Sequence, residues 1–272
     1  MVCEISYCEQ VVRGQDADRY LLCQFAPAGL RPALYALFAF HCEIAKTRDV
    51  VSETQLGLIR LQWWRDAIGK LYSGEVLEFP VLQGLAQVIR EHDLDRADFE
   101  ALIYAREFDL EDVRPSTLEG LLQYCDYTGT PLLRMVGKVL GAEGEPLSVI
   151  AGNYGLVGVL RSVGYFAQKR RCLLPEAVME ARGVKLNQLY DPPSPKASAR
   201  RGGKLQEGMV GVIEECAGAF VGGVRAEHRV FKAMQKLAEV NMGHVRRCGY
   251  DVFDPRYTLP PAFKVLRVVL NL

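Results

Sequence analysis

The stretch ALYALFAFHCEIAKTRDVVSE, residues 33–53, leads from an apolar segment into a charged one. Its first eight residues are all apolar, and Pro32 stands just before them, where the first turn of a helix tolerates proline. We therefore expect one long helix from Leu30 to about Val51. The chemistry of its charged end decides whether this helix belongs to a metal site.

Two carboxylates lie at this charged end, four residues apart, at Asp49 and Glu53. Residues at this spacing share one face of a helix, so the pair could hold a divalent cation if the helix extends that far. Charged side chains at a helix end are more commonly solvated, and the neighbouring Arg48 would repel a metal ion. Ser52 and Gln55 fit a capping box that would open the next helix.

The rest of the chain also repeats its apolar residues at helical spacing, and no stretch alternates as a strand would. This pattern predicts an all-α protein with a single domain over residues 1–272. The predicted helices include residues 146–168, 205–227 and 261–272. Between them, residues 190–204, YDPPSPKASARRGGK, are rich in Pro, Ser, Gly and Arg and predict a mobile loop.

Composition narrows the class of protein. Lys and Arg total 33 and Asp and Glu total 33 in 272 residues, so no excess of charge indicates a nucleic-acid partner. The eight cysteines form no C-x-x-C pair, which argues against a zinc site and fits a reducing compartment. Apolar runs reach only about eight residues, too few to cross a bilayer. We expect a bacterial cytoplasmic protein, or a processed organellar one.

A second informative segment, GNYGLVGVLRSVGYFAQKRRCLLP, covers residues 152–175. Its three glycines, Gly155, Gly158 and Gly164, would allow close approach of another helix. Three cations follow, and they suit either the negative end of a helix dipole or a phosphate group. These cations are Lys169, Arg170 and Arg171.

Together these segments resemble the squalene/phytoene synthase family. Residues 40–53 resemble its F-C-R-x-x-D-D-x-x-D-E motif, and residues 159–175 resemble N-I-L-R-D-x-x-x-D followed by R-x-R-x-Y-L-P. The helix that begins at Tyr124 fits the segment between them. The resemblance implies an isoprenoid-synthase-type bundle of helices around a central apolar cavity. In such a bundle, two aspartate-rich helices hold magnesium against a prenyl diphosphate.

The departures from these motifs fall on the metal ligands. The three aspartates of the first motif correspond to Arg48, Asp49 and Ser52, and those of the second correspond to Ser162 and Phe166. Magnesium prefers oxygen ligands, mostly carboxylates, waters and phosphates. We therefore expect neither a metal cofactor nor catalysis, and Asp49 and Glu53 as the metal ligands if there is one.

A narrower resemblance covers residues 43–68 and the GYDVFDP segment at 249–255. Both are similar to the mitochondrial complex I assembly-factor branch of this superfamily. This resemblance implies a pseudoenzyme that assists assembly of respiratory complex I, with complex I subunits or assembly proteins as partners. It would act at the inner membrane face, on the cytoplasmic side in a bacterium or the matrix side in a mitochondrion.

Two alternatives remain open. One is an active prenyltransferase that joins two prenyl diphosphates head to head, with magnesium held by Asp49, Glu53 and Glu107. The other is a metal-independent carrier of an isoprenoid or another lipid. In either case the candidate ligand-binding residues are Tyr124, Arg161, Lys169, Arg170 and Arg171.

Three smaller predictions concern individual side chains. Trp63 and Trp64 are adjacent and point to different faces, so at most one of them is buried. His41 does not stand at a metal-site spacing from the other histidines, so we expect it to have a core or surface role. The final helix places Phe263, Leu266, Val269 and Leu270 on one face, which we expect to pack on the bundle rather than on a membrane.

Overall fold

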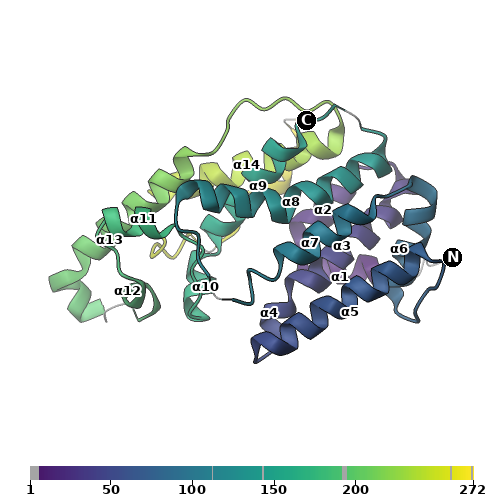
Figure 1. Ribbon diagram of the computed structural model, residues 1–272. Coiled ribbons are helices and arrows are strands. Elements are labelled where there is room, and N and C mark those ends of the chain that lie inside the picture. The colour runs from purple at the N-terminus through teal and green to yellow at the C-terminus, as the bar shows by residue number, and fades with distance from the viewer. Residues whose placement is uncertain (1–5, 112, 143, 192–194, 258, 271) are drawn as a thin grey trace. The chain divides into compact units, whose positions relative to one another are not determined.

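The computed structural model describes residues 6–111, 113–142, 144–191, 195–257, 259–270 and 272, the side chains of 195–204 aside. Over these residues the regular elements are helices, with no strand, so the all-α prediction is confirmed (Figure 1). No helix in this part of the chain is long and apolar enough to cross a membrane.

The contacts between residues divide the chain into two compact units. Unit 1 comprises Met1–Val113, Tyr127–Ser148 and Arg225–Met234, and unit 2 comprises Arg114–Asp126, Val149–Val224 and Gln235–Leu272. Each unit combines distant parts of the chain, so neither is a contiguous domain of the sequence. Three helices contribute residues to both units: α8 (Leu118–Leu140), α9 (Leu147–Arg161) and α14 (Arg229–Arg247).

Unit 1 begins with a series of helices in which α3 packs against both α1 and α6, and α5 packs against α6 and α7. Figure 1 shows these helices in purple and blue. Their bounds are α1 (Tyr7–Gln15), α2 (Ala17–Cys23), η1 (Ala28–Leu30), α3 (Arg31–Ala45), α4 (Thr47–Val50), α5 (Thr54–Tyr72), α6 (Pro80–His92) and α7 (Arg96–Ala105).

Aromatic side chains fill the core of unit 1. The ring of Phe40 lies 5.4 Å from that of Trp64 and 5.3 Å from that of Phe99, measured between centroids, and both pairs meet edge to face. All three residues are fully buried. Edge-to-face pairs contribute about 0.5–1.5 kcal/mol beyond the burial of their area. This cluster fixes the position of α3, which carries the first motif.

Unit 2 holds the second motif. A buried amide connects its parts, because Asn153 on α9 donates to the carbonyl oxygen of Val221 at 2.8 Å and accepts from the same residue's N–H at 2.9 Å. Asn153 also donates to Gln235 on α14 at 3.0 Å. The helices are α9 (Leu147–Arg161), α10 (Val163–Gln168), α11 (Glu176–Ala181), α12 (Leu186–Tyr190), α13 (Pro195–Gly218) and α15 (Lys264–Val269).

The long helix predicted from Leu30 to Val51 is wrong at its charged end. The helix α3 stops at Ala45, and the short α4 follows after Lys46. Val51 is extended, with φ −114° and ψ 145°. The β-branched pair formed by Val50 and Val51 favours this change to extended backbone.

The predicted loop at 190–204 also differs from the structure. Tyr190 ends α12, residues 192–194 lie outside the described part, and α13 already begins at Pro195. Proline has the right φ for the first position of a helix, where its missing N–H is not needed. The Ala and Arg residues that follow have high helix propensity, which offsets the pair of glycines at 202–203.

Candidate functional site

The first motif lies in unit 1, at the junction between α4 and α5. Arg48 and Asp49 belong to α4, whereas Ser52 lies in the bend between the two helices. Glu53 is the N-cap of α5, in extended backbone and without a side-chain capping bond. The helix therefore does not continue from Asp49 to Glu53, so the predicted two-carboxylate face and the predicted capping box are both wrong.

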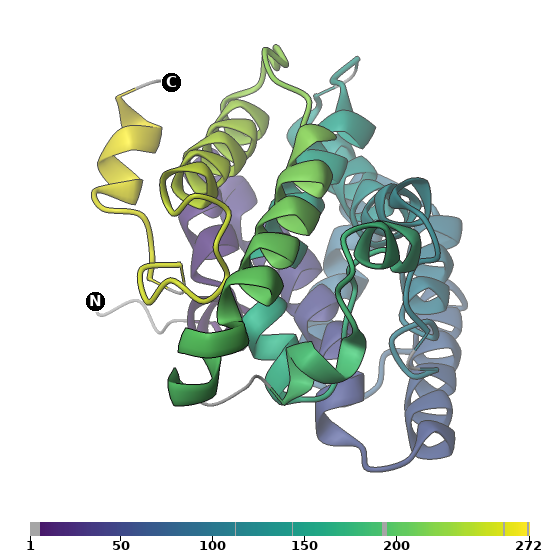
Figure 2. The same cartoon turned by 90° about the vertical axis from the view of Figure 1, so that its left-hand side faces the viewer.

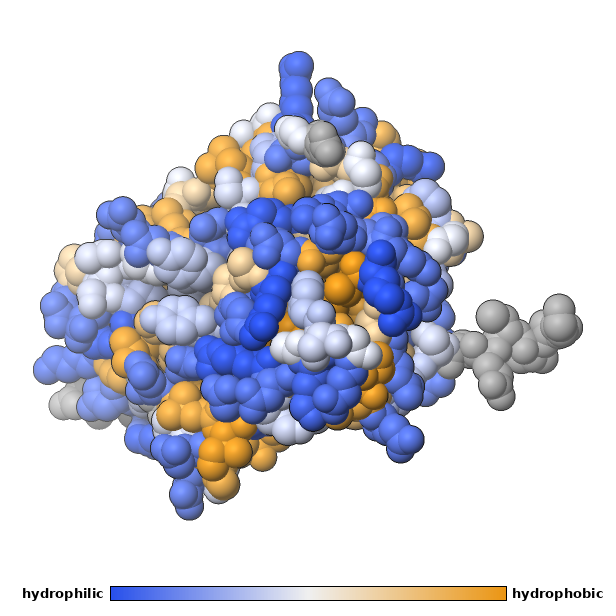
Figure 3. Space-filling view, turned by 45° about the vertical axis from the view of Figure 1, so that its right-hand side comes forward, coloured by the Kyte–Doolittle hydropathy of each residue, from blue (hydrophilic) through white to orange (hydrophobic). Residues whose placement is uncertain are grey.

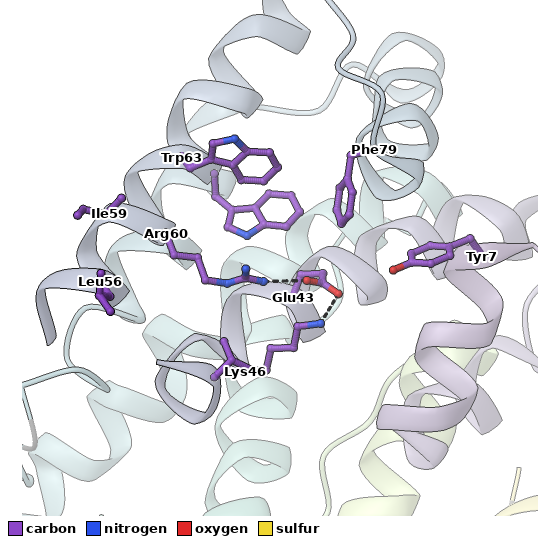
Figure 4. A pocket seen from close by; sticks show the side chains of 10 residues that line it. Tyr7, Glu43, Lys46, Leu56, Ile59, Arg60, Trp63 and Phe79 are labelled. Atoms are coloured by element: carbon purple, nitrogen blue, oxygen red, sulfur yellow. Dashed lines mark hydrogen bonds and ion pairs between the residues drawn. The ribbon is translucent and has the colours of Figure 1, made fainter. Parts of the chain in front are cut away.

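A groove of about 770 Å³ opens beside this junction (Figure 4). Its lining comes from α1, α3, α4, α5 and the residue before α6, and none of the four motif positions belongs to it. Leu56, Ile59 and Trp63 form one wall, and Phe79 stands opposite, with its ring centroid 6.0 Å from that of Trp63. The walls are thus mainly apolar.

Two cations converge on one buried carboxylate in this groove. Lys46 Nζ lies 2.5 Å from Glu43 Oε1, and Arg60 Nη2 lies 3.0 Å from Glu43 Oε2 (Figure 4). Glu43 is 3% exposed, while both cations stay partly exposed. Two positive charges against one negative charge leave a net charge of +1. The arrangement suits an apolar group that carries an anionic end.

Sequence reasoning missed Glu43 as a site residue. The available signal was a lone carboxylate in the apolar run 33–44, with Lys46 three residues further along. The prediction for the tryptophan pair is confirmed, because Trp64 is 0% exposed and Trp63 is 42% exposed. The exposed ring leaves the core and lines the groove instead.

His41, also on α3, is buried between two arginines. Arg19 Nη1 lies 2.9 Å from His41 Nδ1, and Arg106 Nη2 lies 2.9 Å from His41 Nε2. Asp16 and Asp109 pair with these arginines at 3.0 and 3.1 Å. Burial, and then the two positive charges, hold the pKa of His41 well below its usual range. Of the core and surface roles that the sequence left open, His41 has the core role.

The second motif lies in unit 2, where the predicted helix 146–168 is interrupted. Ser162 separates α9 from α10, and its backbone has φ −95° and ψ 3°. Phe166 is partly buried against the core of unit 2. The residues that replace the family's carboxylates therefore serve as a helix junction and an apolar contact.

Each cation that follows α10 lies against an aromatic ring. Lys169 Nζ is 4.4 Å from the ring centroid of Tyr165, Arg171 is 5.2 Å from that of Phe166, and Arg170 is 5.5 Å from that of Tyr190. Arg170 also pairs with Asp191 at 3.3 Å, and both side chains are well exposed. Cation–π contacts of this kind contribute about 0.5–1 kcal/mol each at exposed sites. The ring that replaces one aspartate thus holds a cation of the predicted ligand-binding set.

Other predicted residues fall in different surroundings. Arg161 ends α9, and Tyr124 on α8 packs partly buried against the core of unit 2. Glu107, a ligand in the active-enzyme alternative, pairs with Arg65 at 2.6 Å in unit 1. Over the described residues of either unit, no group of three His, Cys, Asp or Glu side chains could hold a metal ion.

The glycines of the second segment do not share one role. A Cβ on Gly155 would stand 3.0 Å from Cys125 Cβ on α8, so this glycine permits close approach of the two helices. A Cβ on Gly158 or Gly164 would meet no atom within 4 Å. The prediction of close helix approach therefore holds at Gly155 and is wrong at the other two.

Comparison with known proteins identifies the family. The squalene/phytoene synthase family model matches residues 12–262, which include both motifs. The chain belongs to the squalene/phytoene synthase family. A crystal structure of a dehydrosqualene synthase superposes with a TM-score of 0.73 at 20% identity, over 97% of this chain and 93% of that one. The squalene synthase of Alicyclobacillus acidocaldarius gives 0.69 at 19% identity, over 90% and 94%. These two structures show that the fold is that of the isoprenoid synthases.

Relatives of two kinds lie within the family. Complex I assembly factor 6 of Bos taurus is 31% identical over 182 residues, which is 65% of this chain and 55% of that protein. The presqualene diphosphate synthase of Sinorhizobium fredii is 27% identical over 189 residues, which is 66% of this chain and 67% of that protein. The chain therefore spans a little over half the length of the assembly-factor relative.

Proposed function

We propose that this member of the squalene/phytoene synthase family is a non-catalytic protein that assists assembly of respiratory complex I at a membrane face. The observation that carries the proposal is the pair of substituted motifs. Arg48, Ser52, Ser162 and Phe166 stand where the family motifs have aspartates, and none of them can supply a carboxylate to magnesium. Ionisation of an allylic diphosphate needs strong neutralisation of the leaving group, which metal ions provide.

The local geometry supports the same proposal. Asp49 and Glu53 are separated by a helix end and a stretch of extended backbone, and Glu107 is engaged by Arg65. Phe166 is partly buried, and Arg171 stacks on its ring. The similarity to complex I assembly factor 6 supports the assembly role, since that relative carries the role in its name.

A test in the native host separates the two classes of function. We expect deletion of the gene to lower complex I activity and to leave the isoprenoid content unchanged. Complementation with the double variant Asp49→Ala/Glu53→Ala should restore complex I activity as fully as the wild type, because no metal is involved. Loss of isoprenoids with normal complex I activity would contradict the proposal.

A second test uses the purified protein with farnesyl diphosphate and magnesium. We expect no pyrophosphate release above a buffer blank. Turnover that the Asp49→Ala substitution abolishes would show an active prenyltransferase, which the presqualene diphosphate synthase relative makes the alternative to exclude.

A further inference from the structure

The short helix α15 has an unusual distribution of apolar side chains. We expected its apolar face to pack on the bundle, yet Leu266 is 51% exposed, Leu270 is 73% exposed and Phe263, just before the helix, is 78% exposed. Val265 and Val269 are also about half exposed, and Val268 is fully buried. Figure 2 shows α15, in yellow, following the loop that leaves α14 in unit 2.

Helical geometry shows which side of α15 faces outward. Consecutive residues are about 100° apart around a helix axis, so Leu266 and Leu270 lie nearly opposite Val268. Val268 anchors the helix, and the side turned away from this anchor is apolar. A helix on the surface of a water-soluble protein normally presents polar residues there. On the face in Figure 3, apolar side chains show in separate patches among polar ones.

The chain segment that contains α15 has basic side chains and no acidic ones. From residue 259 to residue 272 the chain contains Lys264 and Arg267 and no acidic residue. Around the helix Arg267 lies about 60° from Leu270, at the border of the apolar face. Apolar residues on one side of a helix with basic residues at their border, as Arg267 is here, are typical of helices that lie in the interface of an anionic membrane.

We propose that α15 docks the protein on the surface of an anionic phospholipid bilayer. Phe263, Leu266 and Leu270 enter the boundary between headgroups and acyl chains, while Arg267, at the border of the apolar face, faces the lipid phosphates. The helix is far too short to cross the bilayer, so the attachment is peripheral and reversible. This inference deepens the proposed function, because it names the surface that would hold an assembly protein at a membrane face.

Vesicle co-sedimentation of the full chain tests the proposal without complex I, so its failure can be told apart from failure of the assembly role. We expect the wild type to sediment with vesicles of phosphatidylcholine and phosphatidylglycerol, and less with phosphatidylcholine alone. Leu266→Asp/Leu270→Asp should lower the partition coefficient about ten-fold or more. Arg267→Gln should lower it about five-fold on anionic vesicles only, and added salt should act in the same direction.

Matched controls keep the result interpretable. Tyr104→Asp changes an aromatic residue of α7 that is 58% exposed in unit 1, and it should bind like the wild type. Circular dichroism should show the same helicity for every variant, because the changed side chains are exposed. Wild type that stays in the supernatant with both vesicles, or binding that the Leu266/Leu270 variant retains, would overturn the proposal. Self-association through α15, lost in that variant without any vesicle binding, would assign the face to a second copy instead.

Discussion

At the scale of single residues, Glu43 connects two elements of unit 1. Its carboxylate accepts from Lys46 just after α3 and from Arg60 on α5. Removing one partner of a buried ion pair is costly because the remaining charges lose their compensation. Here both cations retain some access to water, which limits the cost.

We expect Glu43→Gln to lower the free energy of unfolding by about 1–3 kcal/mol, measured by urea denaturation. The matched control is Glu75→Gln, which breaks the exposed pair with Lys70 at 2.8 Å. Exposed pairs contribute about 0–1 kcal/mol, so the control should change stability little. Equal effects of the two substitutions would show that Glu43 is not the buried link described here.

His41 makes the stability of the folded protein depend on pH. Its pKa is depressed in the folded state, so below about pH 6.5 the unfolded chain binds a proton that the folded chain does not. The stability that neutral His41 contributes is fully present above the pKa of the unfolded chain. It falls as the pH drops, by up to about 1.4 kcal/mol per pH unit.

The His41→Gln variant should lose part of this slope between pH 6.5 and 5, measured by chemical denaturation at each pH. The pKa of His228 is also lowered by burial, so the difference between variant and wild type is the relevant quantity. Parallel pH profiles for the two proteins would contradict the assignment.

At the scale of elements, α9 is placed by one close approach. Gly155 faces Cys125 of α8, and Cys125 is fixed in the core of unit 2. Gly158, three residues further along the same helix, faces open space. Substitutions at these two positions therefore distinguish the effect of helix propensity on stability from the effect of packing.

We expect Gly158→Ala to raise the free energy of unfolding by about 0.5–1 kcal/mol, because alanine has the higher helix propensity. Gly155→Ala should be less stable than Gly158→Ala by about 1–3 kcal/mol, since its new methyl group overpacks the contact with Cys125. Thermal unfolding of both variants checks this, and equal melting temperatures would disprove the close approach.

At the scale of the whole molecule, the two units share helices α8, α9 and α14. Unfolding one unit would therefore disrupt helices of the other. Both tryptophans, Trp63 and Trp64, belong to unit 1, whereas helices of both units contribute to circular dichroism.

Urea unfolding followed by tryptophan fluorescence and by far-ultraviolet circular dichroism should give the same midpoint. Coincident transitions indicate two-state behaviour. A fluorescence midpoint distinct from the dichroism midpoint would mean that unit 1 unfolds on its own.

The sequence by itself determined the helical class and the family, because these depend on residue type and spacing along the chain, and it motivates the proposal that the metal-binding carboxylates are missing. That at most one of Trp63 and Trp64 is buried was also predictable, since adjacent residues of a helix point to different faces. Tertiary structure alone decided that Arg60 joins Lys46 on Glu43 and that α15 turns its apolar side outward. Those features depend on which distant side chains meet, and local pattern does not contain that information.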